Sequence, residues 1–220
     1  MFIGFYNYTV VLTYLGLSSA ICGMFGALRH NYQMAVLCLL ICGLCDMFDG
    51  TIARTCKKRS PEAVIFGGQI DSLCDVVCFG VLPAVIGFSL CPMDFFTIIC
   101  CVFFVLAAVI RLAYFNVQEI TKDESEGKRT FYTGMPVTSS ALIMPAVALI
   151  TALDKVTWGY LYPLCLAVLG VLFIARFKVK KPYMVGLIIL AAVGALVFYL
   201  VCRYGGNITC MQSVRGISNV

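Results

Sequence analysis

The sequence predicts an all-α integral membrane protein, and three observations support this prediction. Of the 220 residues, 61% are apolar, whereas about 45–50% is usual in soluble domains. The mean hydropathy is +0.97. The apolar residues also fall into runs close to the roughly 20 residues that a helix needs to cross a bilayer. We therefore expect a single membrane domain over residues 1–220.

Seven apolar runs are the candidate membrane spans. They cover residues 8–28, 32–53, 68–90, 94–118, 135–153, 158–175 and 183–202. The first run lacks the charged region that precedes a cleavable signal sequence, so we expect it to be retained as a span. The sixth run is short, and the seventh is strongly apolar but adds no polar chemistry.

The distribution of basic residues predicts the orientation. With seven spans and the N-terminus inside, ten Lys and Arg residues fall in the inner loops and four on the outer side. This agrees with the positive-inside rule, so we expect a multi-pass protein with a cytoplasmic N-terminus. No basic run with interleaved aromatic residues occurs in a soluble segment, so we expect no nucleic-acid partner.

Four aspartates stand at the adjoining ends of the second and third runs: Asp46, Asp49, Asp71 and Asp75. A carboxylate within a span costs roughly 2.5–3.5 kcal/mol on insertion scales, and four clustered anions repel one another. Spacings of three and four residues place each pair on one face of its helix. Because the two spans are antiparallel neighbours, the sequence predicts facing carboxylates that bind a divalent metal ion.

Apart from the aspartates, the helix faces that carry them have small residues. Gly50, Ala53 and Gly67 lie on these faces, so a large polar ligand can approach the backbone. Arg54 lies one turn away and can hold a phosphate through a bidentate hydrogen bond. Two divalent ions that bridge phosphates are a recurrent means of stabilising phosphoryl transfer.

At these residues the chain resembles the CDP-alcohol phosphotransferase family. The family signature D-x-x-D-G-x-x-A-R…G-x-x-x-D-x-x-x-D is matched at all eight fixed positions, from Asp46 to Arg54 and from Gly67 to Asp75. Twelve residues separate Arg54 from Gly67, about one helical turn more than the common pattern. Within the family the chain is most similar to the small integral-membrane phosphatidylserine synthases, through segments 71–84, 111–116 and 131–139.

The resemblance implies a six-helix core over residues 8–175, with 183–202 as an additional span, in a homodimer among membrane lipids. The active site would open to the cytoplasm. The implied reaction transfers a phosphatidyl group from CDP-diacylglycerol to the hydroxyl of L-serine and releases CMP. Two ions, Mg²⁺ or Mn²⁺, would be held by Asp46, Asp49, Asp71 and Asp75. Asp75 would also be the general base, and the CDP-lipid would contact Gly50, Ala53, Arg54, Gly67 and Thr13.

The acceptor serine carries a carboxylate and an ammonium group, so its pocket needs a cation and hydrogen-bonding groups. Arg111 in the fourth span is the candidate for the serine carboxylate, and Asn116 and Thr133 are candidates for hydrogen bonds. Each has an alternative role. Arg111 would serve as a counter-ion to the aspartates, Asn116 would join two helices, and Thr133 would cap the fifth span.

Three other functions are open on the sequence. A relative that uses glycerol phosphate or inositol phosphate would need several cations near the acceptor, and the inner half of the fourth span offers Arg111 alone. A divalent cation transporter would need polar groups along both leaflets, which the outer halves of the spans lack. A structural scaffold would pair the aspartates with Arg54 and Arg111, which leaves two of the four carboxylates uncompensated.

Overall fold

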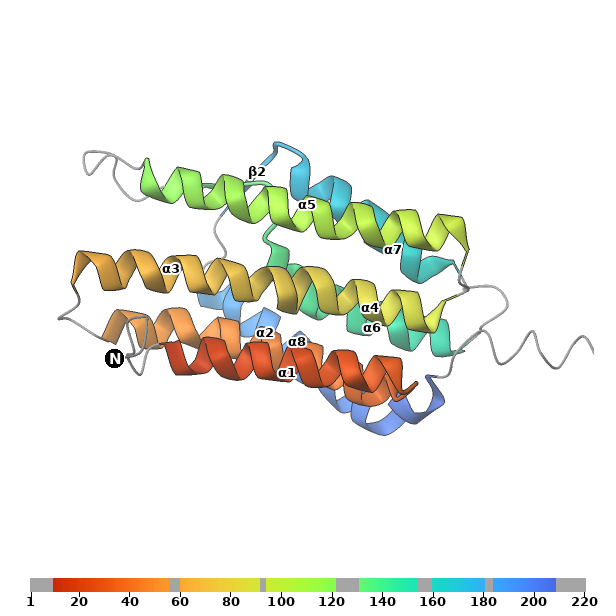
Figure 1. Cartoon of the computed structure of the whole chain (residues 1–220). Coiled ribbons are helices and arrows are strands. Elements are labelled where there is room, and N and C mark those ends of the chain that lie inside the picture. The colour runs from red at the N-terminus through yellow and green to blue at the C-terminus, as the bar shows by residue number, and fades with distance from the viewer. Residues whose placement is uncertain are drawn as a thin grey trace, which may run out of the picture.

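The computed structural model describes residues 10–55, 60–91, 94–121, 131–153, 160–180 and 184–208, and within them long helices run side by side in a bundle (Figure 1). This confirms the predicted all-α membrane fold. Two three-residue strands that the sequence did not predict, β1 (Phe131–Thr133) and β2 (Lys178–Lys180), pair in antiparallel fashion. The helices are α1 (Val11–Leu28), α2 (Tyr32–Thr55), α3 (Pro61–Asp75), α4 (Leu82–Leu90), α5 (Phe95–Ile120), α6 (Ser140–Leu153), α7 (Leu161–Ile174) and α8 (Met184–Tyr204).

Four helical segments of the described chain are long and apolar enough to cross a membrane, judged by length and composition. They are Val11–Leu28, Tyr32–Gly50, Glu62–Leu90 and Phe95–Gln118. The remaining apolar helices, in α6, α7 and the second half of α8, are shorter. The first four predicted spans correspond to these four segments. The count of seven spans stays a prediction, because residues 154–159 and 181–183 lie outside the described ranges.

The predicted starts of the third and fifth spans, at residues 68 and 135, are wrong. The third helix begins at Pro61, because Ser60 caps it by accepting a hydrogen bond from the Ala63 N–H at 3.2 Å. Proline suits the first helical position, where its missing N–H leaves no bond unmade. The additional residues before Gly67 therefore lengthen α3. In the fifth span Pro136 is extended, and α6 begins only at Ser140, after a 3₁₀ turn.

The helical segment that runs from α3 into α4 is irregular just after Asp75. Between α3 and α4 the chain forms a π-helical segment, Val76–Val81. Pro83 has no N–H to donate to the Phe79 carbonyl. The Ser140 hydroxyl of α6 donates to that carbonyl instead, at 3.0 Å, and the Tyr162 hydroxyl of α7 donates to the Pro83 carbonyl at 3.1 Å. These bonds tie the irregular segment to α6 and α7.

Small residues let α1 and α2 approach closely, as is common between membrane helices. A Cβ added at Gly23 would lie 2.8 Å from the Cβ of Cys38, and one added at Gly16 would lie 3.3 Å from the Cβ of Cys45. Two turns toward the N-terminus of α1 therefore correspond to two turns toward the C-terminus of α2, so the two helices are antiparallel. This antiparallel register continues to the end of α2 that carries Asp49.

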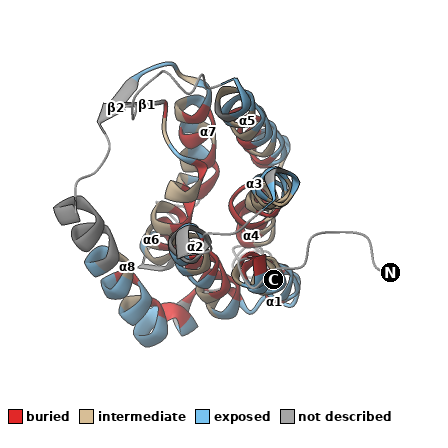
Figure 2. Ribbon diagram, turned by 90° about the vertical axis from the view of Figure 1, so that its left-hand side faces the viewer, coloured by how far each residue is buried: buried red, intermediate tan, exposed pale blue. Residues whose placement is uncertain are grey.

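Helix α8 lies at the edge of the bundle, beside α2 and α6 and away from α3 and α5 (Figure 2). Gln33 of α2 attaches it: the side-chain amide donates to the carbonyls of Val201 and Cys202, at 3.2 and 3.1 Å. Val201 is fully buried, and Val197 one turn earlier is buried as well. α8 is therefore packed into the bundle at its C-terminal end.

Candidate functional site

Two helices bring three of the predicted aspartates together. Asp46 and Asp49 lie near the C-terminal end of α2, and Asp71 lies in the last turns of α3. One carboxylate oxygen from each of the three lies within 4.8 Å of the other two. The two acidic helix faces therefore meet, as the spacing predicted.

Asp75 lies one turn beyond Asp71 on α3. It does not belong to the group of three, but it is close enough to interact electrostatically with Asp46, Asp49 and Asp71. The sequence treated the four aspartates as one set of ligands. In the structure the carboxylates of Asp46, Asp49 and Asp71 form one group, and that of Asp75 lies next to it.

The gathered carboxylates fit a hard divalent cation. Asp49 is only 8% exposed, and desolvated anions in contact repel one another unless a positive charge compensates them. No ion pair with a Lys or Arg is found for them among the described side chains, which do not include that of Arg54. An all-oxygen set of ligands suits Mg²⁺, Mn²⁺ or Ca²⁺ rather than thiolate-seeking metals.

Thr13 reaches the aspartates from α1. Its hydroxyl donates to Asp49 Oδ2 at 3.4 Å, and both side chains are 8% exposed. The register set by Gly16 and Cys45 accounts for this contact, because one further turn on each helix brings residue 13 level with residue 49. Thr13 therefore forms part of the wall of the site.

The predicted open face is present at both glycines. A Cβ added at Gly50 or Gly67 would meet nothing within 4 Å. Ala53 and Arg54 lie in the last turn of α2, but their side chains fall outside what the structure describes. The backbone next to the aspartates is thus accessible to a bulky ligand.

Two contacts of α5, one with α3 and one with the π-helical segment, determine how deep Arg111 lies along the bundle. Ser72 donates to Asn116 Oδ1 at 2.8 Å, and a Cβ added at Gly80 would lie 3.2 Å from the Cβ of Ala108. Interpolating along these antiparallel helices places Arg111 level with the residues that directly follow Asp75. The predicted acceptor residue therefore lies close to the depth of Asp75.

The loop before α6 holds the Arg111 side chain. Arg111 is 8% exposed, and its Nε donates to the Met135 carbonyl at 3.2 Å. Gly134 has a φ of 77°, a left-handed conformation that glycine adopts without strain, and its N–H donates to the Phe177 carbonyl at 2.7 Å. Among the described residues Arg111 forms no ion pair with the aspartates.

The other two acceptor candidates have different outcomes. Asn116 does join two helices through Ser72, so its structural role is present. Thr133 lies in strand β1, and the 3₁₀ turn before α6 begins only at Val137, so Thr133 does not cap that helix. The side chain of Thr133 lies outside the described side chains.

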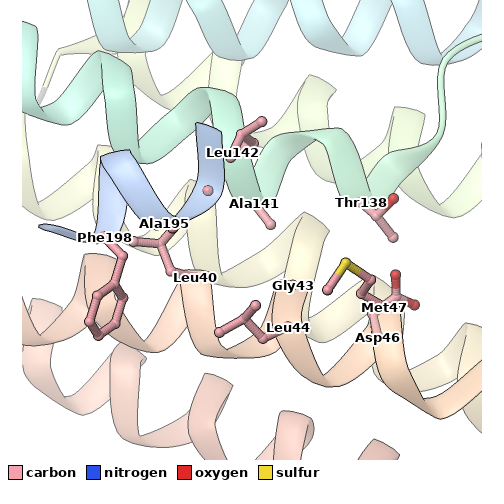
Figure 3. Close-up of a pocket in the computed structure, with 11 residues that line it drawn as sticks. Leu40, Gly43, Leu44, Asp46, Met47, Thr138, Ala141, Leu142, Ala195 and Phe198 are labelled. Atoms are coloured by element: carbon pink, nitrogen blue, oxygen red, sulfur yellow. The ribbon is translucent and has the colours of Figure 1, made fainter. Parts of the chain in front are cut away.

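Sequence reasoning missed Ser72 and Thr138. Ser72 positions Asn116, and its place next to Asp71 is the signal that could have revealed it. Thr138 and Asp46 both line a cavity of about 530 Å³ between α2, α6 and α8 (Figure 3). No spacing in the sequence predicts that cavity, because it depends on where α8 packs.

Comparisons with known proteins agree with this geometry. A family model described as CDP-alcohol phosphatidyltransferase matches residues 6–175. The chain is 39% identical over 119 residues to the CDP-diacylglycerol–serine O-phosphatidyltransferase of Saccharomyces cerevisiae, across 52% of this chain and 41% of that protein. It is 29% identical over 181 residues to the protein of that name from Mycobacterium leprae, across 79% of this chain and 58% of that protein.

A third protein of the same name, from Bacillus subtilis, is 27% identical over 184 residues, which cover 80% of this chain and 91% of that protein. The chain therefore spans less than two thirds of the yeast and M. leprae proteins but most of the B. subtilis protein. No solved structure matches the chain. The segment matched by the family model contains all four aspartates and ends before α8.

Proposed function

The chain belongs to the CDP-alcohol phosphatidyltransferase family, and on that premise we propose that it transfers the phosphatidyl group of CDP-diacylglycerol to L-serine. The products are phosphatidylserine and CMP. The observation that carries the proposal is the approach of the Asp46, Asp49 and Asp71 carboxylates to within 4.8 Å of one another. The names of the three relatives and the depth of Arg111 support serine as the acceptor.

The proposed metal site takes two divalent ions, Mg²⁺ or Mn²⁺, on Asp46, Asp49, Asp71 and the adjoining Asp75. Bound ions of this kind neutralise the charge that develops on a pyrophosphate during transfer. Five further residues would contact the CDP-lipid, among them Thr13, which reaches Asp49 from α1. Gly50 and Gly67 leave room for it beside the backbone, and Ala53 and Arg54 lie on the last turn of the same helix.

The reaction also needs a base for the serine hydroxyl. A primary alcohol is a weak nucleophile at neutral pH, and a positioned base typically contributes about 10²–10⁴-fold. In the proposed step the serine oxygen bonds to the phosphorus that carries diacylglycerol. The bond from this phosphorus to the CMP oxygen breaks, and the hydroxyl proton passes to Asp75. Asp75 suits this role because it adjoins the three gathered carboxylates without being one of them.

Arg111 is the proposed partner of the serine carboxylate. Its Nε donates to the Met135 carbonyl, which orients the planar guanidinium, and its terminal nitrogens are proposed to bind the carboxylate. Asn116 and Thr133 are proposed to donate or accept hydrogen bonds at the same pocket. We also propose that the site faces the cytoplasm, which the basic inner loops support, and that the protein is a homodimer, which the family resemblance supports.

An acceptor panel tests the proposed function. Purified protein with CDP-diacylglycerol is expected to release CMP when L-serine is supplied, and to release little with glycerol 3-phosphate or inositol phosphate. The physical reason is that a phosphorylated acceptor brings two negative charges to a pocket for which Arg111 is the one cation among the described side chains of α5. CMP release with glycerol 3-phosphate but not with serine would overturn the choice of acceptor.

Replacing Arg111 by lysine is expected to raise the KM for serine by about tenfold or more and to leave the KM for CDP-diacylglycerol nearly unchanged. Lysine keeps the charge but loses the planar fork that binds a carboxylate bidentately. Initial rates with each substrate varied separately would measure both constants. Arg203→Lys, at the opposite end of the bundle, is the matched control. An unchanged KM for serine together with a lowered Tm would assign Arg111 to folding alone.

A further inference from the structure

We propose that α8 forms one wall of a groove that receives an acyl chain of the phosphatidyl donor, and that Ala195 and Phe198 determine which chain lengths fit. The inference rests on the proposed function, since it names the part of the donor that the aspartates do not contact. It concerns a helix outside the family-matched residues 6–175.

The groove has one polar end and an apolar interior. Its volume is about 530 Å³, within the range of about 300–1,000 Å³ that small-molecule sites occupy. Figure 3 shows Asp46 and Thr138 at one end and Phe198 with Leu40 at the other. Between these ends the lining is apolar and comes from α2, α6 and α8.

The polar end coincides with the candidate metal site. Asp46 both lines the groove and belongs to the three gathered carboxylates. A donor whose pyrophosphate lies at those carboxylates must place its glycerol and the first carbons of its acyl chains close by. From Met47 to Leu40 the groove follows α2 for about 10 Å, away from the aspartates and toward the middle of the helix. This is the direction that an acyl chain must take.

Packing of α8 shapes the groove. α2 and α6 touch at its floor, where a Cβ added at Gly43 would lie 2.8 Å from the Cβ of Ala141. α8 is attached to α2 through Gln33 near its C-terminal end, at Val201 and Cys202. Further toward its N-terminus Ala195 is exposed, and a Cβ added at Gly194 would make only ordinary contact with α6, at 3.6 Å. The α8 wall is thus anchored to α2 near its C-terminal end and lies against α6 at Gly194, while Ala195 stays exposed.

The acyl chain is selected by shape rather than by hydrophobicity. A chain that moves from the bilayer into an apolar groove leaves one hydrocarbon environment for another, so the transfer itself provides little driving force. Discrimination must then come from the available length and width. Phe198 closes the far end, and the small Ala195 side chain leaves the middle open.

The test compares donors in the full-length protein. Wild-type protein, Ala195→Trp, Phe198→Ala and Val193→Trp are assayed with serine and with dipalmitoyl or dioctanoyl CDP-diacylglycerol in mixed micelles. Ala195→Trp fills the groove and is expected to lower the ratio of kcat/KM for the long donor to that for the short donor by about tenfold. Phe198→Ala lengthens the groove and is expected to shift the ratio in the opposite direction. Val193 is 40% exposed and does not line the groove, so Val193→Trp should leave the ratio unchanged.

Three results would overturn the inference. The first is an unchanged ratio in both groove variants while wild-type protein is active. The second is an equal change in Val193→Trp, which would indicate a general disturbance of α8. The third is a loss of dimers in Ala195→Trp with an unaltered donor ratio, which would assign the groove to a second copy of the chain. If Ala195→Trp does not fold, Phe198→Ala decides alone.

A binding measurement separates this inference from the proposed function. The rise in Tm on adding each CDP-diacylglycerol is measured for the same four proteins without any acceptor. A wild-type protein that transfers to no acceptor but shows the chain-length shifts would reject the proposed activity and keep the groove. An active protein without these chain-length shifts would keep the proposed activity and reject the groove.

Discussion

Asp75→Asn is expected to give a folded protein that binds CDP-diacylglycerol but turns over about 10²–10⁴-fold more slowly. Asparagine has nearly the same shape as aspartate but cannot accept the serine proton. The variant keeps the three gathered carboxylates of the proposed metal site, Asp46, Asp49 and Asp71, so binding of the donor should survive. CMP release under saturating substrates measures turnover, and the rise in Tm on adding the donor measures binding.

Asp94→Asn is the matched control for this variant. Asp94 caps α5 by accepting the Thr97 N–H at 2.9 Å, at the end of the bundle away from the site, and asparagine caps helices about as well as aspartate. Its turnover should equal that of wild-type protein. Near-normal turnover in Asp75→Asn would reject Asp75 as the base. Loss of donor binding in the same variant would make Asp75 chiefly a metal ligand.

Removal of divalent ions is expected to abolish transfer, with a loss of about 10³-fold or more, which corresponds to several kcal/mol of transition-state stabilisation. Activity should return on adding Mg²⁺ or Mn²⁺ after the chelator is dialysed away. The same ions should raise Tm in the absence of substrate. They compensate the repulsion among Asp46, Asp49 and Asp71, and a ligand that binds only the folded state stabilises that state.

The rise in Tm provides a measurement that does not depend on activity. Asp49→Asn removes a gathered carboxylate that is 8% exposed, so the metal-dependent rise should shrink or disappear. Asp94→Asn should keep the full rise. Transfer that persists in protein shown by elemental analysis to lack divalent metal would contradict the proposed site.

The aspartate pairs were predictable because they depend on local geometry. Residues three or four apart share a helix face whatever the rest of the chain does, so the acidic faces of α2 and α3 could be derived from spacing. The short connection between them made the helices antiparallel neighbours. The start of α3 was not predicted, because Ser60 and Pro61, where the helix begins, lie in the segment that the sequence assigns to the connection between the two spans.

Contacts between distant segments were not predictable in the same way. The bond from Thr13 to Asp49 depends on how closely small residues let α1 approach α2. The depth of Arg111 depends on the register of α5 against α3, which Ser72 and Asn116 hold. Neither register leaves a periodic trace in the sequence.

Hydropathy and residue spacing thus sufficed for the membrane class, the long helices and the two acidic faces, because bilayer thickness and helical periodicity act on each segment separately. Packing between helices brought Thr13 to Asp49 and placed α8 beside α2. These features depend on close packing between side chains that are far apart in the chain. Apolar residues of similar hydropathy are compatible with many packing arrangements, so hydropathy does not determine which one the bundle adopts.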